Sequence, residues 1–359
     1  MNTFTIKTPK GERKIGPGEP CFIIAEVSAN HNQKFEKAVE IIKKTAEAGA
    51  DAVKFQTYTP DTLTIDCDKP AFVFEGDENP WKGQKLYDLY KTAYTPWDWL
   101  PKLKEEAEKV GLVFFSTDYD ITAVDFMEEM GVELHKIGSY EVTHIPLLKR
   151  VAETGKPVVL SIGYASLEEA TLAIYTLKEN GTKDLVVMHC TTTYTENPEM
   201  DTMNLHNIQD ISKRFDVISG FSENAGGVDS TVQAVLAGAR VIEKHVIDTK
   251  EESSPDSKFS IDTNELAELV KKVREAEVSL GKVNYGPANE KEVYNMKHMR
   301  KSLFIVEDVR AGDVFTKENL RVIRPGIGLS PKHMDEILGK KASSDVERGE
   351  AMTWDFVKR

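Results

Sequence analysis

The chain lacks the features that would assign it to several common protein classes. It has 3 cysteines in 359 residues, Cys21, Cys67 and Cys190, an odd number without metal-ligand spacing. We therefore predict reduced thiols in a cytoplasmic protein and no disulfide framework. No run of about 18 apolar residues occurs, so no membrane-spanning helix is predicted. The first residues contain no apolar run, so no signal peptide is expected.

Basic residues are fewer than acidic ones: the chain has 46 Lys and Arg residues and 59 Asp and Glu residues, so its formal charge is −13. An acidic surface argues against nucleic acid or anionic lipid as the main partner, although it allows a local basic pocket. Hydrophobic residues make up 40% of the chain and charged residues 29%, which is the balance of an ordinary globular protein.

Short apolar runs alternate with amphipathic stretches from about residue 20 to residue 280. The runs are FIIAEV (22–27), AVKFQ (52–56), VFFST (113–117), LHKIG (134–138), PVVLSIG (157–163), LVVMHC (185–190), VISGFS (217–222) and VIEKHV (241–246). Such nearly continuous apolar strands are typical of a parallel sheet covered on both faces. Helices are predicted between them, most clearly at 35–50, 99–111 and 265–281.

Eight strand–helix units in about 260 residues predict an α/β fold of the (β/α)8 (TIM) barrel type. An open doubly wound sheet is the alternative, but no glycine-rich dinucleotide loop follows the first strand. About 40 residues separate Gln56 from Trp97. An insertion of that length on the catalytic side of a barrel is typical of a lid or substrate loop.

The pattern changes near Gly281, so we predict a barrel domain over 1–281, a polar linker over 282–298 and a small module over 299–359. The module has short strands and frequent turns. A domain of about 60 residues has a thin core and gains stability by docking on a partner.

The predicted strands end in an unusual number of polar residues, and function gathers at these ends in a barrel. They include Glu26, Lys54, Gln56, Thr117, Lys136, Ser139, Glu141, Ser161, His189, Ser222, Glu223, Asn224, Glu243, Lys244 and His245. Lysines inside apolar strands are costly unless they meet an anion or a carboxylate. Lys54 and Lys136 therefore predict either a site for phosphate and carboxylate, or structural ion pairs with Glu26 or Glu243.

Two other strand-end residues have a functional and a structural interpretation. Glu26 suits proton transfer or metal binding, or a structural salt bridge to Lys54. His245 suits metal binding or acid catalysis, although a lone histidine is often structural. The residues alone leave both alternatives open.

Motifs in order along the chain resemble one known family. They are FIIAEVSANHN, AVKFQTYTPDTLT, FFSTDYD, HKIGSYE, VVLSIG, MHCTTTY, GFSEN and VIEKHVID, with RPGIGLSP and LGKKA in the tail. With these motifs the chain resembles the sialic acid synthase family from about residue 15 to 358, and within it the branch that makes pseudaminic acid.

The resemblance implies a barrel followed by an antifreeze-like (SAF) domain. It also implies a domain-swapped homodimer in which the tail of one subunit caps the barrel of the other, with Arg324 contacting the sugar of the neighbouring site. The implied reaction joins phosphoenolpyruvate to an acetamido sugar to give a nine-carbon 2-keto acid and phosphate.

The resemblance also implies a role for each matching residue. Glu26 matches the catalytic glutamate. The positions that hold phosphoenolpyruvate are Lys54, Thr117, Lys136, Ser139, Ser161 and Ser222, and those near the amino sugar are Gln56, Glu141, Tyr194 and Asp256. His245 matches one of two histidines that bind a divalent metal, manganese in preference to magnesium.

The chain departs from the family at the other metal ligand, because the expected Ser-Asp-His reads Ser222-Glu223-Asn224. Asn224 is a weaker, neutral oxygen ligand. Three outcomes follow: His245 holds the metal with Asn224, Glu223 and waters; the metal binds weakly; or the enzyme is altered or inactive. Other products remain open, namely N-acetylneuraminic or legionaminic acid, as does a non-catalytic sugar-binding or regulatory relative.

Overall fold

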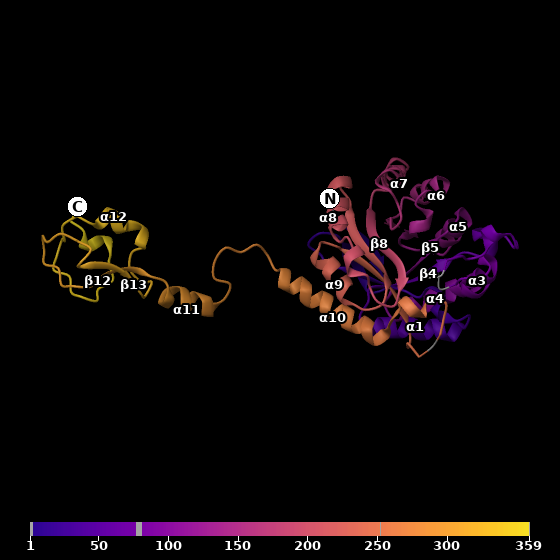
Figure 1. Ribbon diagram of the computed structural model, residues 1–359, viewed down its shortest axis with the longest axis horizontal. Helices are drawn as coiled ribbons and strands as arrows, with labels where there is room; N and C mark the ends of the chain where they lie inside the picture. The colour runs from indigo at the N-terminus through magenta and orange to yellow at the C-terminus, as the bar shows by residue number, and fades with distance from the viewer. Residues whose placement is uncertain (1–2, 77–80, 252, 359) are drawn as a thin grey trace. The chain divides into compact units, whose positions relative to one another are not determined.

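The computed structural model of the chain describes residues 3–76, 81–251 and 253–358. It divides into two compact units, Met1–Gly281 and Lys282–Arg359. Figure 1 shows that helices surround the strands of the first unit. Among the described residues, no helix is long and apolar enough to cross a membrane.

Eight parallel strands close into a barrel in the first unit. They are β3 Phe22–Glu26, β4 Ala52–Thr57, β5 Val113–Asp118, β6 His135–Ile137, β7 Val158–Ser161, β8 Leu185–Thr195, β9 Ile218–Ala225 and β10 Val241–Ile247. Each pairs with the next along the chain, and β10 pairs with both β9 and β3, which closes the ring. Every strand falls on one of the eight apolar runs, so the predicted barrel is confirmed and an open sheet is excluded.

Helices cover the outside of this barrel (Figure 1). They are α1 Phe35–Ala48, α4 Leu100–Lys109, α5 Ile121–Glu129, α6 Ile145–Glu153, α7 Leu167–Glu179, α8 His206–Phe215, α9 Asp229–Leu236 and α10 Thr263–Leu280. The helices predicted at 35–50, 99–111 and 265–281 correspond to α1, α4 and α10. Local signals fix their ends: Asp262 and Glu265 form a capping box at the start of α10, and Gly49 ends α1 with φ of 88°.

An N-terminal hairpin closes the barrel at the end where the strands begin. Its strands, β1 Phe4–Thr8 and β2 Gly11–Ile15, pair in antiparallel register. Ile6 and Ile15 belong to the same buried cluster as Phe22, which stands first in β3. Burial of these apolar side chains removes them from water and closes the amino ends of the strands, so the opposite end is left for a site.

The long insertion after β4 has structure of its own. It contains α2 Pro60–Leu63, the 3-10 turn Pro70–Phe72, α3 Leu86–Ala93 and the 3-10 turn Trp97–Trp99. Backbone hydrogen bonds join Phe74 to Gln84 and Gly83. Residues 77–80 of the predicted lid segment lie outside the described residues.

The second unit has a small core of its own. It contains α11 Glu290–Met299, β12 Ser302–Ile305, β13 Leu320–Ile323 and α12 Met334–Ile337, with 3-10 turns at Pro331–His333 and Trp354–Phe356. Buried Leu303, Phe315 and Met352 lie in its apolar cluster. The segment predicted as a polar linker holds helix α11, which has no buried residue. Its polar composition indicated exposure correctly but not the helix, which Asn289 caps.

Candidate active site

A cavity of about 320 Å³ opens at the carboxyl ends of the barrel strands, where the sequence predicts the site. This volume suits small-molecule substrates. Thirteen of the predicted site residues line it: Glu26, Lys54, Gln56, Thr117, Lys136, Ser139, Glu141, Ser161, Tyr194, Ser222, Asn224, His245 and Asp256. Residues spread over 230 positions of the chain thus meet in one place, because strand register brings them together.

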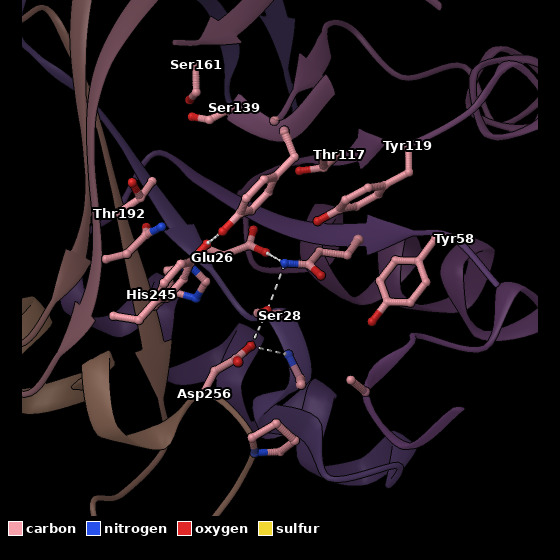
Figure 2. Close-up of a pocket in the computed structure, with 18 of the residues that line it drawn as sticks. Glu26, Ser28, Tyr58, Thr117, Tyr119, Ser139, Ser161, Thr192, His245 and Asp256 are labelled. Atoms are coloured by element: carbon pink, nitrogen blue, oxygen red, sulfur yellow. Dashed lines mark hydrogen bonds between the residues drawn. The ribbon is translucent and has the colours of Figure 1, made fainter. Parts of the chain in front are cut away.

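One end of the cavity carries a cation that no carboxylate neutralises directly. Lys136, at 2% exposure, donates to the Ser161 hydroxyl at 2.7 Å and to the carbonyl of Ile137 at 3.0 Å. Within the described residues it forms no ion pair, and burial lowers the pKa of its ammonium. Figure 2 shows Ser139 and Ser161 side by side, with Thr117 nearby. Hydroxyls around an unpaired buried cation provide a site for an anion.

Close backbone approach shapes the same end of the cavity. The Gly163 backbone NH donates to the Ser139 hydroxyl at 2.9 Å. A β-carbon on Gly163 would lie 3.0 Å from Ser139 Oγ and 3.1 Å from the carbonyl oxygen of Cys190. Because glycine has no side chain, the loop after β7 can approach Ser139 closely enough for its backbone NH to hold the Ser139 hydroxyl in place.

The second lysine is held between two carboxylates. Lys54 Nζ lies 2.6 Å from Glu26 Oε2 and 3.4 Å from Glu243 Oε1, and it donates to Thr117 Oγ1 at 2.7 Å. Glu26 and Lys54 are register partners on β3 and β4, which places their side chains on the same side of the sheet. The proposed salt bridge thus exists, but it lies inside the cavity and does not exclude a role in chemistry.

The pKa values of the two carboxylates around Lys54 are shifted in opposite directions. Burial raises the pKa of Glu26 above its usual range, although the Lys54 ammonium opposes this shift. Burial acts in the same direction on Glu243, but Lys136 and Lys54 outweigh it and lower its pKa. Glu26 is consequently the carboxyl group of this pair that suits proton transfer near neutral pH.

Another part of the cavity is lined by side chains that are linked by hydrogen bonds and that can bind hydroxyl and amide groups of a ligand. Gln56 Nε2 donates to Glu26 Oε1 at 2.9 Å and to Ser28 Oγ at 2.8 Å, and Ser28 in turn donates to Asp256. Figure 2 shows Ser28 and Asp256 joined in this way. Nearer the lysines, Glu141 has a buried carboxylate oxygen without a partner in the described part of the chain, and burial raises its pKa to about 7 although Lys136 and Lys54 oppose this shift.

Two side chains of the cavity are suited to bind a divalent cation, but they do not form a complete set of ligands. The Nδ1 atom of His245 is buried and finds no hydrogen-bond partner among the described residues. Burial lowers the pKa of His245 to about 3, so the imidazole is neutral, as a metal ligand must be. Asn224 lines the same cavity. No group of three or more His, Cys, Asp or Glu side chains within the described ranges is arranged to hold a metal.

Glu223 is not placed to bind a metal in the cavity, and that prediction is wrong. Its carboxylate accepts from Ser230 at 2.5 Å, Thr231 at 2.6 Å and Lys244 at 2.7 Å, on the helix-facing side of the sheet. Side chains alternate along a strand, so Ser222 and Asn224 face the barrel mouth while Glu223 faces outward.

Arg324 lies in the second unit and is exposed. Its Nε donates to the carbonyl of Met299 at 2.7 Å. Its contact with a neighbouring active site stays a prediction.

Two other histidines near strand ends form hydrogen bonds within the fold. His189 bonds to the carbonyl of Met203, and His31 bonds to the hydroxyl of Thr95.

Several cavity residues escaped the sequence analysis. They are Ser28, Tyr58, Tyr119, Tyr140, Cys190, Thr192 and Phe259, together with Leu63, Phe74, Trp81, Leu89, Tyr90 and Ala93 from the insertion. The predicted substrate loop thus supplies an apolar wall of the cavity. Cys190, predicted only to be a reduced thiol, is the last residue of the apolar run 185–190, and that position is the signal that would have found it.

Family models match both units of the chain. The model described as the NeuB family matches residues 41–285, and the model of the SAF domain matches residues 300–358. These ranges agree with the expected barrel and antifreeze-like tail.

Individual relatives match nearly the whole chain. The pseudaminic acid synthase of Campylobacter jejuni subsp. jejuni serotype O:2 is 40% identical over 92% of this chain and 95% of its own. The N,N'-diacetyllegionaminic acid synthase of Legionella pneumophila is 33% identical over 97% of each. The crystal structure of N-acetylneuraminic acid synthetase from Leptospira borgpetersenii, in complex with citrate, has a TM-score of 0.71 at 29% identity, covering 82% of this chain and 96% of that one.

Proposed function

This chain belongs to the NeuB family and is a transferase that makes a nonulosonic acid, and we propose that it condenses phosphoenolpyruvate with an acetamido sugar to give pseudaminic acid. The greater identity to the Campylobacter pseudaminic acid synthase than to the Legionella legionaminic acid synthase supports this product. Legionaminic and N-acetylneuraminic acid are the alternative products.

The observation that carries the proposal is the buried ammonium of Lys136, which forms no ion pair within the described residues. A buried charge without a counter-charge destabilises a protein, so it is kept where a ligand supplies the missing charge. Phosphoenolpyruvate carries a phosphate and a carboxylate. We assign these groups to Lys136 and Lys54 with the surrounding hydroxyls of Thr117, Ser139, Ser161 and Ser222.

The sugar belongs beside Gln56, Glu141, Tyr194 and Asp256. Carboxylate and amide oxygens accept hydrogen bonds from sugar hydroxyls, and the amide of Gln56 donates to sugar oxygens. Holding both substrates in one cavity brings the vinyl carbon of phosphoenolpyruvate to the aldehyde carbon of the open-chain sugar.

The reaction forms one carbon–carbon bond, and at one carbon it replaces the bond to the phosphate oxygen with a bond to the oxygen of water. The vinyl carbon attacks the aldehyde, whose oxygen takes a proton and becomes a hydroxyl. Water then adds to the cationic carbon that bears the phosphate, and phosphate leaves with cleavage of its bond to that carbon, which becomes the ketone. Glu26, with its raised pKa, is positioned to exchange protons in these steps, and its ionised form stabilises the cation.

His245 and Asn224 would hold a divalent cation, manganese in preference to magnesium, with water or substrate completing its ligands. When bound, such a cation polarises the aldehyde carbonyl. The unpartnered Nδ1 atom of His245 supports this assignment. Asn224→His should then tighten manganese binding, which isothermal calorimetry measures without any turnover; unchanged affinity would mean that position 224 contributes no ligand.

We further propose a homodimer in which the SAF unit of one subunit covers the barrel mouth of the other and Arg324 contacts the sugar. The exposed guanidinium of Arg324 and the thin core of the second unit support this arrangement. The cytoplasmic location stays a prediction.

The test supplies phosphoenolpyruvate with a panel of acetamido hexoses, in manganese or magnesium, and follows release of phosphate together with the 2-keto acid. We expect turnover with the sugar that leads to pseudaminic acid, and Lys136→Met should reduce it strongly. Lys183→Met, which changes an exposed lysine of the barrel, is the matched control and should not alter the rate. No phosphate release with any sugar would favour the non-catalytic sugar-binding relative that Asn224 suggests.

A further inference from the structure

The 3-10 turn Ser28–His31, which follows β3 after one residue, is buried and has a strained backbone. All four of its residues are buried. Ser28 has a φ of 48°, and Gln33, two residues beyond the turn, has a φ of 53°. Left-handed backbone is unfavourable for residues with a side chain, and such strain persists where the surrounding contacts require one geometry. The contacts of the turn therefore indicate what it holds in place.

Asn30 joins this turn to β10 and to the loop of residues 253–260. Its side chain has 0% exposure, and its amide nitrogen donates to the carbonyl of Val246 and to the hydroxyl of Ser260, both at 2.8 Å. Its amide oxygen accepts a hydrogen bond from the hydroxyl of Ser254. Both N–H groups of the amide are thus used within the protein, and Asn30 is not among the residues that line the cavity.

Asn30 acts on a cavity residue through Ser260. The Ser260 hydroxyl, which accepts from Asn30, donates to the backbone carbonyl of Asp256 at 2.7 Å. The carboxylate of Asp256 is held by the same turn: its Oδ2 atom accepts from the Ser28 hydroxyl at 2.5 Å and from the Ala29 backbone NH at 3.2 Å (Figure 2). Three consecutive residues of the turn therefore fix both the backbone and the side chain of Asp256.

This arrangement leaves the second carboxylate oxygen of Asp256 for a ligand. Both hydrogen bonds that the carboxylate accepts from the described residues go to Oδ2, and Asp256 lines the cavity. Its Oδ1 atom can accept a hydrogen bond from a sugar hydroxyl or from an acetamido NH. Such a bond to a charged group is strong, but it weakens steeply when its geometry is disturbed. A small displacement of the loop should therefore weaken sugar binding.

The next residue of the turn holds a different wall of the cavity. His31 Nε2 lies 3.1 Å from the Thr95 hydroxyl, and the His31 ring lies edge-on to Trp99 with centroids 5.8 Å apart. Thr95 belongs to the insertion after β4. Because Asn30 and His31 contact separate segments, their substitutions should have separate effects.

We propose that Asn30 is a positioning residue for sugar binding: through Ser254 and Ser260 it holds the loop that directs Asp256 Oδ1 into the cavity. The inference rests on the proposed function for the identity of the sugar and for the role of Asp256. It adds a residue outside the cavity on which that role depends. Asn30 itself needs no contact with the substrate.

A double-mutant cycle between Asn30 and Asp256 tests the proposal. Asn30→Asp keeps the size of the side chain but removes both N–H donors, and it should raise the KM for the sugar about 5- to 10-fold. The KM for phosphoenolpyruvate should stay within about 2-fold. A purely structural role would instead reduce the amount of active enzyme and leave both KM values unchanged. Asp256→Asn should raise the sugar KM at least as much, and adding Asn30→Asp to it should change this KM no further.

A second variant and two controls guard against loss of folding. Because a buried carboxylate at position 30 can prevent folding, Ser260→Ala, which removes only the linking hydroxyl, should give the same selective rise in the sugar KM. His31→Gln changes the same turn, and its effect should add to that of Asp256→Asn. Asn207→Asp, at an exposed position of α8, should match the unaltered protein.

Hydrogen exchange provides a readout that does not depend on turnover. The backbone amides of residues 253–260 should exchange faster in Asn30→Asp and in Ser260→Ala, but not in His31→Gln. Unchanged exchange of this loop in both of the first two variants would overturn the proposal. Additive losses from Asn30→Asp and Asp256→Asn would do the same, as would an equal rise in the KM for phosphoenolpyruvate.

Binding of the sugar, measured by calorimetry, separates this inference from the proposed function. If the sugar binds the unaltered protein without turnover, the proposed reaction alone fails, and the cycle is decided on Kd. If turnover is confirmed and Asn30→Asp leaves the sugar KM unchanged, the inference alone fails. If no acetamido sugar binds, both are refuted.

Discussion

Buried charges at the mouth of the barrel and buried charges on the outside of its sheet are arranged in opposite ways. Outside, Lys244 meets Glu223 at 2.7 Å, and His135 lies between Asp118 and Glu128 at 2.7 and 3.0 Å. At the mouth, Lys136 has only a hydroxyl and a carbonyl, and His245 leaves one ring nitrogen unpartnered within the described residues. Lys54, also at the mouth, is paired with Glu26 and Glu243, so the contrast concerns Lys136 and His245. The paired groups outside the sheet serve the fold, whereas these two unmatched groups are kept for ligands.

The strongest test of this contrast is Lys136→Met. Loss of an anion-binding cation should reduce turnover by roughly 100- to 1,000-fold. Thermal stability should stay equal or rise, because the variant removes a buried charge that lacks a counter-charge. Phosphate release and the Tm are the two measurements. A large fall in Tm would show that Lys136 serves the fold, and the contrast between the two regions would fail.

The outer pair should show the reverse behaviour. Glu223→Gln leaves the ammonium of Lys244 buried without a counter-charge and should cost roughly 3–5 kcal/mol of unfolding free energy. Turnover per folded molecule should change little, because neither residue lines the cavity. Chemical denaturation measures the loss. The double variant Glu223→Leu/Lys244→Met, which removes both charges, is the control and should recover most of the stability; failure to recover would locate the loss in packing.

The pH dependence of stability sharpens the same comparison. Burial alone would lower the pKa of His135, but its bonds to Asp118 and Glu128 raise it to about 9. A raised folded-state pKa contributes stability that is fully present below about pH 6.5 and is lost as the pH rises through about 9. The contribution is at most roughly 3 kcal/mol. Denaturation between pH 6 and 10 should show this slope, and His135→Gln should remove it. An unchanged slope in that variant would assign the pH effect to another group.

The smallest expected effect concerns Gly163. Gly163→Ala places a β-carbon within about 3 Å of Ser139 Oγ and the Cys190 carbonyl, which should cost roughly 1 kcal/mol of stability. Displacement of Ser139 should raise the KM for phosphoenolpyruvate by about 2- to 10-fold, the effect of one weakened hydrogen bond. Gly155→Ala is not a suitable control because its φ is 70°. Gly286→Ala, at an open position without positive φ, is suitable and should leave both quantities unchanged.

Strand periodicity explains both a success and an error of the sequence analysis. Ser222 and Asn224 lie two residues apart and face the cavity together, as do Glu243 and His245 on the next strand. Glu223 and Lys244 occupy the intervening positions, are register partners and pair outside the sheet. The same alternation, applied to the motif Ser222-Glu223-Asn224, would have removed Glu223 from the metal ligands.

The sequence by itself determined the barrel. Parallel strands that are covered on both faces need apolar residues at nearly every position, so they appear as apolar runs separated by amphipathic helices. The sequence also predicted that Lys54 and Lys136 each meet an anion or a carboxylate, since a lysine in such a run needs a partner. Only the tertiary structure decided which partner each lysine has, and that Asn30 meets Ser254 and Ser260. Those contacts join side chains that are far apart in the sequence, and strand register and loop geometry bring them together.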